Sequence, residues 1–155
     1  MENSPGTALA ACSPGSVFVL SSRMSPAAPA VPPSPSGDVV IRTIAMPAVA
    51  NANGDIFGGW LVSQMDLGGA ILARSTALSR VTTVAIDAMS FINPVSVGDT
   101  VSCYARLVSI GRTSMKISVE AWVQHFITGA QQRVTAGLFT YVAIDAEGKP
   151  HPVKR

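Results

Sequence analysis

One acidic residue, Asp66, lies in an otherwise apolar and glycine-rich stretch of the chain, NANGDIFGGWLVSQMDLGGAILA. Between Ile56 and Ser79 the only other charged residue is Arg74. A carboxylate beside apolar surface is costly unless it is paired, hydrogen-bonded or protonated. Such a carboxylate can act as a general base or as a nucleophile, and both roles are open to Asp66. The structural alternative is a carboxylate that pairs with Arg74 or with nearby backbone.

Two adjacent glycines, Gly58 and Gly59, stand where a helix that contains Asp66 is expected to begin. The start of a helix offers backbone N–H groups without intrahelical acceptors and the positive end of the helix dipole. Because glycine has no side chain, a substrate carbonyl can reach these N–H groups. The pair is therefore a candidate oxyanion site for an acyl-transfer reaction in which Asp66 is the base or nucleophile.

The spacing of these residues has a consequence for assembly. Asp66 follows Gly59 by seven residues, which is roughly 10 Å along a helix axis. A reacting carbonyl must lie about 3 Å from both the base and the oxyanion donors, and one helix cannot meet both conditions. A second, antiparallel copy of the helix would bring its Asp66 opposite Gly59 of the first. We therefore expect a two-fold dimer with two shared active sites.

The elements that position these residues follow from the periodicity of the sequence. Apolar residues at helical spacing cover residues 58–78, directly after a turn signal at residues 53–55. Strand-like segments rich in Val, Ile, Thr and aromatic residues cover 38–46, 81–92, 100–110, 113–126 and 132–145. This order predicts an α+β fold with one long helix on an antiparallel sheet of about five strands. In the helix, Gly68 and Gly69 are expected to let another backbone approach closely.

Composition limits the classes of function. The chain has 155 residues, 48% of them apolar and 13% charged, which indicates one domain with a buried subunit interface. The net charge of +2, without a run of Lys or Arg, argues against nucleic-acid binding. No apolar run approaches the ~20 residues of a membrane span.

The first 37 residues have a different character from the rest. They hold most of the 11 prolines and much of the Ser and Ala, so we expect a disordered extension before a domain at 38–155. Leu9-Ala10-Ala11-Cys12 has the form of a lipoprotein cleavage box, but no basic and apolar segment precedes it. Cys103 falls in a strand pattern and is expected to be buried. Two cysteines give no disulfide framework, and a reduced, cytoplasmic protein is expected.

Residues 38–153 closely resemble the YciA-type acyl-CoA thioesterases, which have the hotdog fold. The segments that carry the resemblance are IRTIAMP, NANGDIFGGWLVSQMDLGGAILA, FINPVSVGD, GRTS and VAIDAEGKP. The family motif maps onto Asn51, Gly54, Gly58-Gly59 and Asp66, and one departure is Val49, where many relatives carry a polar residue. The resemblance implies a long central helix wrapped by a curled antiparallel sheet. It also implies hydrolysis of acyl-CoA to free fatty acid and coenzyme A, and a hexamer built as three dimers. Coenzyme A is then part of substrate and product, and no separate cofactor is expected.

A hairpin tip is the candidate site for the phosphates of coenzyme A. At Gly111-Arg112-Thr113-Ser114 a glycine frees the backbone and an arginine offers a phosphate fork, although a basic hairpin alone is usually a solvated turn. The resemblance assigns this loop to the nucleotide end of the substrate. Arg80 and Lys149 are weaker candidates for the same contact.

Other candidate residues have competing structural interpretations. By resemblance Asn51 orients the attacking water or the thioester carbonyl, and the alternative is a plain loop cap. Thr83 either hydrogen-bonds the Asp66 region or faces solvent, and Asp55 is expected to cap the helix. Met65 and Met89 either line an acyl tunnel or belong to the core.

Two rival functions remain to be distinguished. A hotdog hydratase or dehydratase would use a histidine beside the helix acid, but His125 and His151 are far from it in sequence. A non-catalytic acyl-CoA sensor would have no use for Asp66. Without a Cys/His cluster, no metal site is expected.

Overall fold

The computed structural model describes residues 34–153, and Cys12 and most of the proline-rich segment lie outside this range. The elements are β1 (Asp38–Ile44), a 3-10 turn at Pro47–Val49, α1 (Gly58–Ala77), β2 (Arg80–Ile86), β3 (Thr100–Ile110), β4 (Ser114–Gln124) and β5 (Gln131–Ile144). The predicted order of one strand, one long helix and four strands is confirmed. The predicted helix of residues 58–78 is one residue too long.

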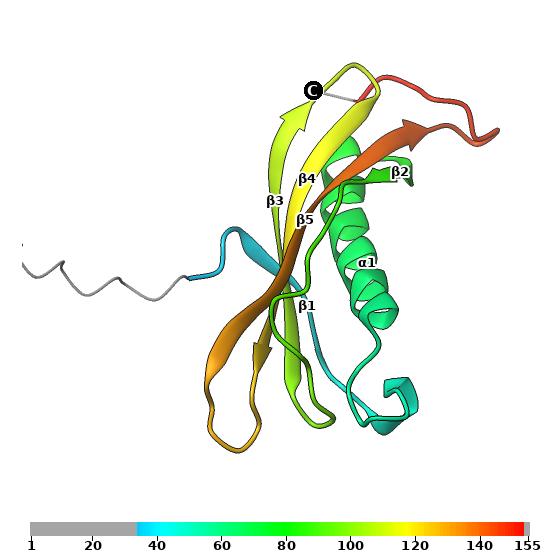
Figure 1. Ribbon diagram of the computed structural model, residues 1–155. Coiled ribbons are helices and arrows are strands. Elements are labelled where there is room, and N and C mark those ends of the chain that lie inside the picture. The colour runs from blue at the N-terminus through cyan, green and yellow to red at the C-terminus, as the bar shows by residue number, and fades with distance from the viewer. Residues whose placement is uncertain (1–33, 154–155) are drawn as a thin grey trace, which may run out of the picture. The chain divides into compact units, whose positions relative to one another are not determined.

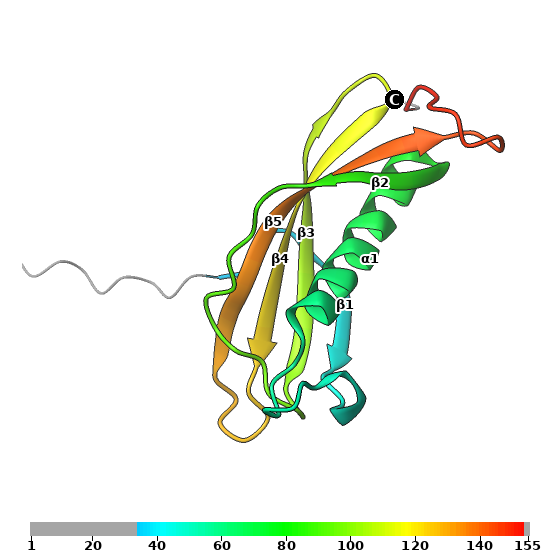
Figure 2. The same cartoon turned by 45° about the vertical axis from the view of Figure 1, so that its right-hand side comes forward.

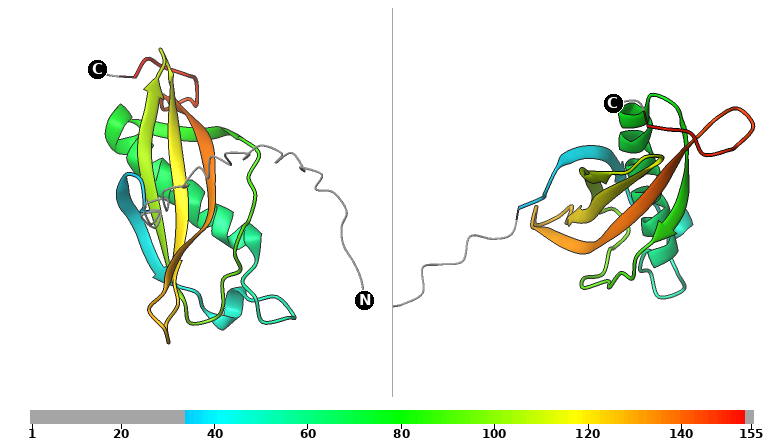
Figure 3. Two further views of the ribbon diagram at one scale, coloured as in Figure 1. Left: turned by 60° about the vertical axis from the view of Figure 1, so that its left-hand side comes forward. Right: turned by 90° about the horizontal axis from the view of Figure 1, so that it is seen from above.

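The five strands form one antiparallel sheet in the order β1-β3-β4-β5-β2 (Figure 1). The two strands that flank α1 in sequence, β1 and β2, are therefore the two edges of the sheet. Seen from above in Figure 3, α1 lies between these edge strands on one side of the sheet. The architecture is the hotdog arrangement of one helix packed on a curled antiparallel sheet, as predicted.

The core lies between α1 and the sheet. α1 contributes buried residues at intervals of four, which keeps them on one face of the helix: Leu61, Met65, Gly69, Ala73 and Ala77. The sheet contributes alternate residues of its central strands, among them Ile117, Val119, Phe139 and Tyr141, all fully buried. Cys103 belongs to this core as predicted, and burial raises the pKa of its thiol to about 12.

Gly68 and Gly69 in α1 have a different role from the predicted one. A Cβ on Gly68 would lie 2.7 Å from Val40 Cγ2, and a Cβ on Gly69 would collide with the hydroxyl of Tyr141. Within the chain, these glycines make room for side chains of β1 and β5. Within residues 34–153, the neighbours of these two glycines are side chains and not a second backbone, so the expectation of a close backbone approach was wrong.

The predicted strand at 81–92 was too long. β2 ends at Ile86, and residues 87–99 form an irregular segment whose first part follows β5, where Asp87 N and Ile92 N still donate to Leu138 O and Val134 O. Side-chain bonds replace the regular ladder: Thr135 Oγ1 donates to Ser90 O, and Asn93 Nδ2 donates to Arg133 O. The alternation of side chains along the sequence does not by itself show where the regular strand ends.

The two ends of the domain carry different loops (Figures 1 and 2). One end holds the start of α1, the loop before it and the segment 87–99. The other holds the β3–β4 hairpin, the end of α1 and the chain after β5. No helix among residues 34–153 has the length and apolar character that crossing a membrane requires.

Candidate active site

The carboxylate of Asp66 is held by two hydroxyl groups. Asp66 is half-buried near the middle of α1, and Thr83 Oγ1 donates a hydrogen bond of 2.7 Å to its Oδ1. The single O–H of Tyr141 is shared between two acceptors: its Oη lies 2.9 Å from the backbone oxygen of Asp66 and 3.2 Å from the same Oδ1. The hydrogen bond expected from Thr83 is present. Within residues 34–153, no ion pair joins Asp66 to Arg74, so the hydroxyls are its partners.

Tyr141 was not singled out from the sequence. The alternation of residues along β5 indicates that Tyr141 faces inward, but not that it reaches a helix residue 75 positions earlier. A usable signal was Gly69, because a glycine in a helix that packs on a sheet often faces a bulky side chain. Burial and the neighbouring Asp66 carboxylate raise the pKa of Tyr141 well above its ordinary value. The phenol therefore stays protonated and remains a donor.

The start of α1 has free backbone N–H donors, as predicted from Gly58-Gly59. Phe57 is the N-cap residue and provides no side-chain cap. Among the described residues, the N–H groups of Gly58 and Gly59 have no acceptor. The prediction that Asp55 caps the helix was wrong, because α1 begins after Phe57 and Asp55 instead forms a β-bridge with Ser96.

Asn51 caps the loop, which is the structural interpretation given to it. Its Oδ1 accepts hydrogen bonds from the backbone N–H groups of Asn53 at 2.9 Å and Asp55 at 3.1 Å, so it caps the turn before α1. Its Nδ2 donates to no described residue. Because the loop holds the carbonyl side of the amide, the amino side is left free to meet a ligand.

A cleft of about 300 Å³ opens beside Gly58. It is lined mainly by apolar side chains of α1 and the 87–99 segment, including Leu61, Phe91 and Val95. The Phe91 ring lies over the helix start, where a Cβ on Gly58 would be 3.3 Å from its Cζ. Met65 is fully buried in the core and lines no part of this cleft, while Met89 lies against Gly137.

The β3–β4 hairpin lies at the opposite end of the domain from the start of α1 (Figure 2). Its backbone is fixed: Gly111 N donates to Ser114 O, Ala143 N to Thr113 O, and Val153 N to Arg112 O. The Arg112 side chain is exposed. Within one chain, the proposed nucleotide loop and the proposed oxyanion site are therefore not brought together.

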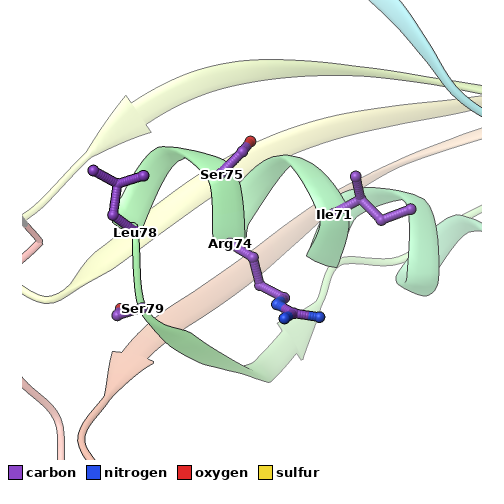
Figure 4. A pocket seen from close by; sticks show the side chains of 5 residues that line it. All are labelled: Ile71, Arg74, Ser75, Leu78 and Ser79. Atoms are coloured by element: carbon purple, nitrogen blue, oxygen red, sulfur yellow. The ribbon is translucent and has the colours of Figure 1, made fainter.

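The weaker candidates lie near that hairpin or on the same half of the domain. Arg80 donates from Nη1 to the backbone oxygens of Asp145 and Ala146, so it supports the turn after β5. Lys149 lies in that turn and is exposed. A hollow of about 470 Å³ at the end of α1 is lined by Ile71, Arg74, Ser75, Leu78 and Ser79 (Figure 4), and Arg74 is exposed.

The histidines take no part in this arrangement. His125 lies in the β4–β5 turn, where its Nδ1 is 3.4 Å from Thr128 N, and the ring of His151 contacts Pro152 O. In the described part of the chain, no three His, Cys, Asp or Glu side chains are grouped so as to hold a metal ion.

Comparison with known proteins identifies the family. The thioesterase superfamily model matches residues 53–126. The acyl-CoA thioester hydrolase YciA of Escherichia coli K12 is 57% identical over 119 residues, which are 75% of this chain and 90% of that protein. A hexameric thioesterase from Yersinia pestis superposes with a TM-score of 0.75 at 53% identity, covering 79% of this chain and 99% of that one.

A second solved structure agrees with the first. A hexameric broad-specificity acyl-coenzyme A thioesterase has a TM-score of 0.77 and 49% identity, covering 79% of this chain and 85% of that one. The family-model match at residues 53–126 spans α1 with Asp66 and the strands β2, β3 and β4. The resemblance seen in the sequence is thus confirmed, and the chain belongs to the YciA-type acyl-CoA thioester hydrolases.

Proposed function

We propose that this protein hydrolyses acyl-CoA to a free carboxylic acid and coenzyme A, with the carboxylate of Asp66 as its reactive group. One observation carries the assignment: Asp66 is a half-buried helix carboxylate that two hydroxyls hold, with no ion-pair partner among residues 34–153. A carboxylate kept in this way is available for chemistry and is not used to pair a charge.

Two routes are open to this carboxylate. As a general base, Asp66 takes a proton from water while the water oxygen attacks the thioester carbonyl. The C–S bond then breaks, and the coenzyme A thiolate leaves and takes up a proton. As a nucleophile, Asp66 attacks the carbonyl carbon, the C–S bond breaks, and the coenzyme A thiolate leaves and takes up a proton; water then hydrolyses the resulting mixed anhydride and restores the carboxylate. Both routes place negative charge on the carbonyl oxygen.

That charge needs donors, and the start of α1 offers them. The free N–H groups of Gly58 and Gly59 lie at the positive end of the helix dipole. Asn51 adds an amide nitrogen whose orientation is set by the two hydrogen bonds to its Oδ1. These three groups form the proposed oxyanion and water-positioning set.

The oxyanion donors and the base of one site come from two copies of the chain in this proposal. Both Gly59 and Asp66 lie on α1, roughly 10 Å apart along its axis, while the reaction allows about 3 Å. β2 is an edge strand whose outer side has no strand partner within the described chain. Edge-to-edge pairing of two β2 strands about a two-fold axis would set the two α1 helices antiparallel.

Exposed apolar side chains support an interface at this edge. On β2, Val84 is 55% exposed and Ile86 41%, and on α1, Leu67 is 55% exposed and Ile71 51%. A second copy would cover these side chains. In an antiparallel pair, the end of one α1 helix lies beside the start of the other. The partner's Arg112 hairpin would then lie near the oxyanion site and could hold the phosphates of coenzyme A.

The larger assembly follows the solved relatives. The two compared structures are hexameric thioesterases. We propose three such dimers per hexamer for this chain. Native mass spectrometry should then give about six times the chain mass of 16.0 kDa.

Release of free thiol from acyl-CoA, followed with a chromogenic disulfide, tests the proposed reaction. A thioesterase releases one thiol per acyl-CoA consumed. A hydratase would change an enoyl-CoA without releasing thiol, and a sensor would bind acyl-CoA and leave it intact. Absence of thiol release over a series of acyl chain lengths would refute the proposal.

A further inference from the structure

We propose that Tyr141 is a positioning residue that fixes which oxygen of the Asp66 carboxylate faces the substrate. In this view Oδ1 is anchored to the sheet and Oδ2 is the oxygen that takes the proton or attacks the acyl group. The inference rests on the proposed function, and the experiments below separate the two.

The hydrogen bonds at Asp66 are unevenly shared between its two oxygens. Thr83 Oγ1 donates to Oδ1 at 2.7 Å, and Tyr141 Oη, whose single proton is shared with the backbone oxygen of Asp66, lies 3.2 Å from the same Oδ1. Oδ2 accepts from no described residue. An oxygen that accepts one O–H bond and a share of a second is a poorer proton acceptor than its free neighbour, so the uneven contacts select Oδ2 for the reaction.

The two donors are placed by the sheet. Thr83 on β2 and Tyr141 on β5 are directly opposite each other in the antiparallel register. Opposite residues present their side chains on the same face of a sheet. The carboxylate of Asp66 therefore meets a pair of hydroxyls whose separation is set by backbone hydrogen bonds between two strands.

Tyr141 has little freedom to leave this position. Its side chain is fully buried and stacks on Phe139, with ring centroids 6.4 Å apart and planes inclined by 12°. Its hydroxyl occupies the space that a side chain at residue 69 would fill. The same hydroxyl also donates to the backbone oxygen of Asp66, so it fixes the helix and the carboxylate together.

Among residues 34–153, no other charged or titratable side chain takes part in this contact. The other such residues on the strands that pack against α1 form no hydrogen bond or ion pair with Asp66 in the described structure; they are Asp38, Arg42, Arg80, Cys103, Tyr104, Arg106, Lys116, Glu120 and Arg133. Because burial keeps the Tyr141 phenol protonated, its donor role holds throughout the range in which the enzyme is assayed.

The first test is Tyr141→Phe, measured as kcat and KM for acyl-CoA over a range of pH. We expect kcat to fall roughly tenfold, the fold-change that one hydrogen bond to a charged group is worth, and KM to stay within about twofold. The acid limb of the pH profile should move to higher pH, because a carboxylate that loses a donor is protonated more readily.

The matched control is Tyr104→Phe. The chain has two tyrosines, and Tyr104 lies on β3, where its hydroxyl accepts a hydrogen bond from Arg42. This control should keep the wild-type kcat and pH profile. An effect of Tyr141→Phe on stability alone would lower the melting temperature and leave the acid limb in place, and this result would overturn the proposal.

A second variant tests the same contact without removing it. In the Tyr104→Phe background, Tyr141 is the only tyrosine, so 3-fluorotyrosine fed to the expressing cells replaces it alone. Fluorine makes the phenol a stronger donor at nearly the same size. The acid limb should then move to lower pH, opposite to the shift in Tyr141→Phe. Shifts in the same direction, or none, would overturn the proposal even if Tyr141→Phe does not fold.

Asp66→Asn separates this inference from the proposed function. If Asp66→Asn keeps activity, the assignment of Asp66 fails, and the positioning role fails with it. If Asp66→Asn is inactive and Tyr141→Phe behaves as the wild type in kcat and pH profile, only the role of Tyr141 fails.

Discussion

Asp66 and Arg74 are about two turns apart on α1, and their surroundings differ. Arg74 is exposed beside the hollow on the last turns of the helix, while Asp66 is half-buried and accepts hydrogen bonds from the sheet. Asp66, whose charge is costly to place beside apolar residues, is thus the charged residue of α1 that receives hydrogen bonds from the sheet.

Asp66→Asn should lower kcat by roughly 10²–10⁴-fold while the fold and the oligomer stay intact. Asparagine is nearly isosteric and still accepts hydrogen bonds from Thr83 and Tyr141, but it cannot act as a base. Thiol release measures the loss, and circular dichroism with native mass spectrometry checks the fold. Asp38→Asn, an exposed acid at the start of β1, is the control. Activity within tenfold of the wild type would end the assignment.

Arg112→Ala should raise KM for acyl-CoA more than it lowers kcat. The exposed guanidinium is proposed to contact phosphate equally in the ground state and the transition state, which is uniform binding. The effect should shrink in high salt, where attraction to phosphate is screened. Steady-state kinetics at two ionic strengths measure both quantities. An unchanged KM at low salt would remove the hairpin from the proposed nucleotide site.

Residue types and spacing were enough to select part of the candidate site. Asp66 is conspicuous because it is charged in an apolar helix, and Gly58-Gly59 because they precede that helix. Tyr141 is not conspicuous in this way, since its partner is set by which strand neighbours α1. That information depends on sheet order, which alternation along one strand does not contain.

At the scale of elements, the prediction succeeded where local signals agree. The start of α1 has a turn signal before it and regular apolar spacing after it, and its first residue was predicted correctly. At the end of β2, no turn signal in the sequence marks the residue at which the strand stops. Residues 87–92 alternate like a strand, yet they leave the regular ladder and are held by side-chain bonds from Asn93 and Thr135. These long-range bonds have no local sequence signature.

Gly68→Ala should destabilise the contact between α1 and β1. The added Cβ would lie 2.7 Å from Val40 Cγ2, and overpacking of this kind costs about 1–3 kcal/mol. The melting temperature should fall by several degrees. Val40→Ala in the same chain should restore part of the loss, because it removes the methyl group that collides.

Gly59→Ala is the matched control for this change. A Cβ on Gly59 meets no atom within 4 Å, and alanine is the better helix former. Its melting temperature should equal or exceed that of the wild type. Equal losses in the two variants would show that the effect at residue 68 does not come from packing against Val40.

At the scale of the whole molecule, the question is whether one chain is a complete catalyst. The start of α1 and the β3–β4 hairpin that carries Arg112 lie at opposite ends of the domain (Figure 1), and Asp66 is near the middle of α1. The proposed shared site would explain this separation, because an antiparallel partner would bring the missing parts to each end. The argument from spacing was available in the sequence, but the choice of β2 as the joining edge required the sheet order.

Two inactive variants should therefore restore each other when mixed. One is Asp66→Asn, and the other is Gly59→Val, whose side chain has room within the chain but obstructs the approach to the helix start. In a mixed dimer both lesions fall in one site and the other site is intact. Random mixing after co-refolding should recover about a quarter of wild-type activity. Mixed dimers that form and stay inactive, with Gly59→Val shown to fold, would exclude the shared site.

The open edge at β2 also affects how the protein can be handled. In a very dilute solution, where a dimer dissociates, each chain would carry an unpaired strand with two aliphatic side chains beside it. Such an edge is a template on which β-aggregation begins. Dilution would therefore remove activity reversibly by separating the chains, whereas concentrating dissociated chains would let these edges pair incorrectly and aggregate.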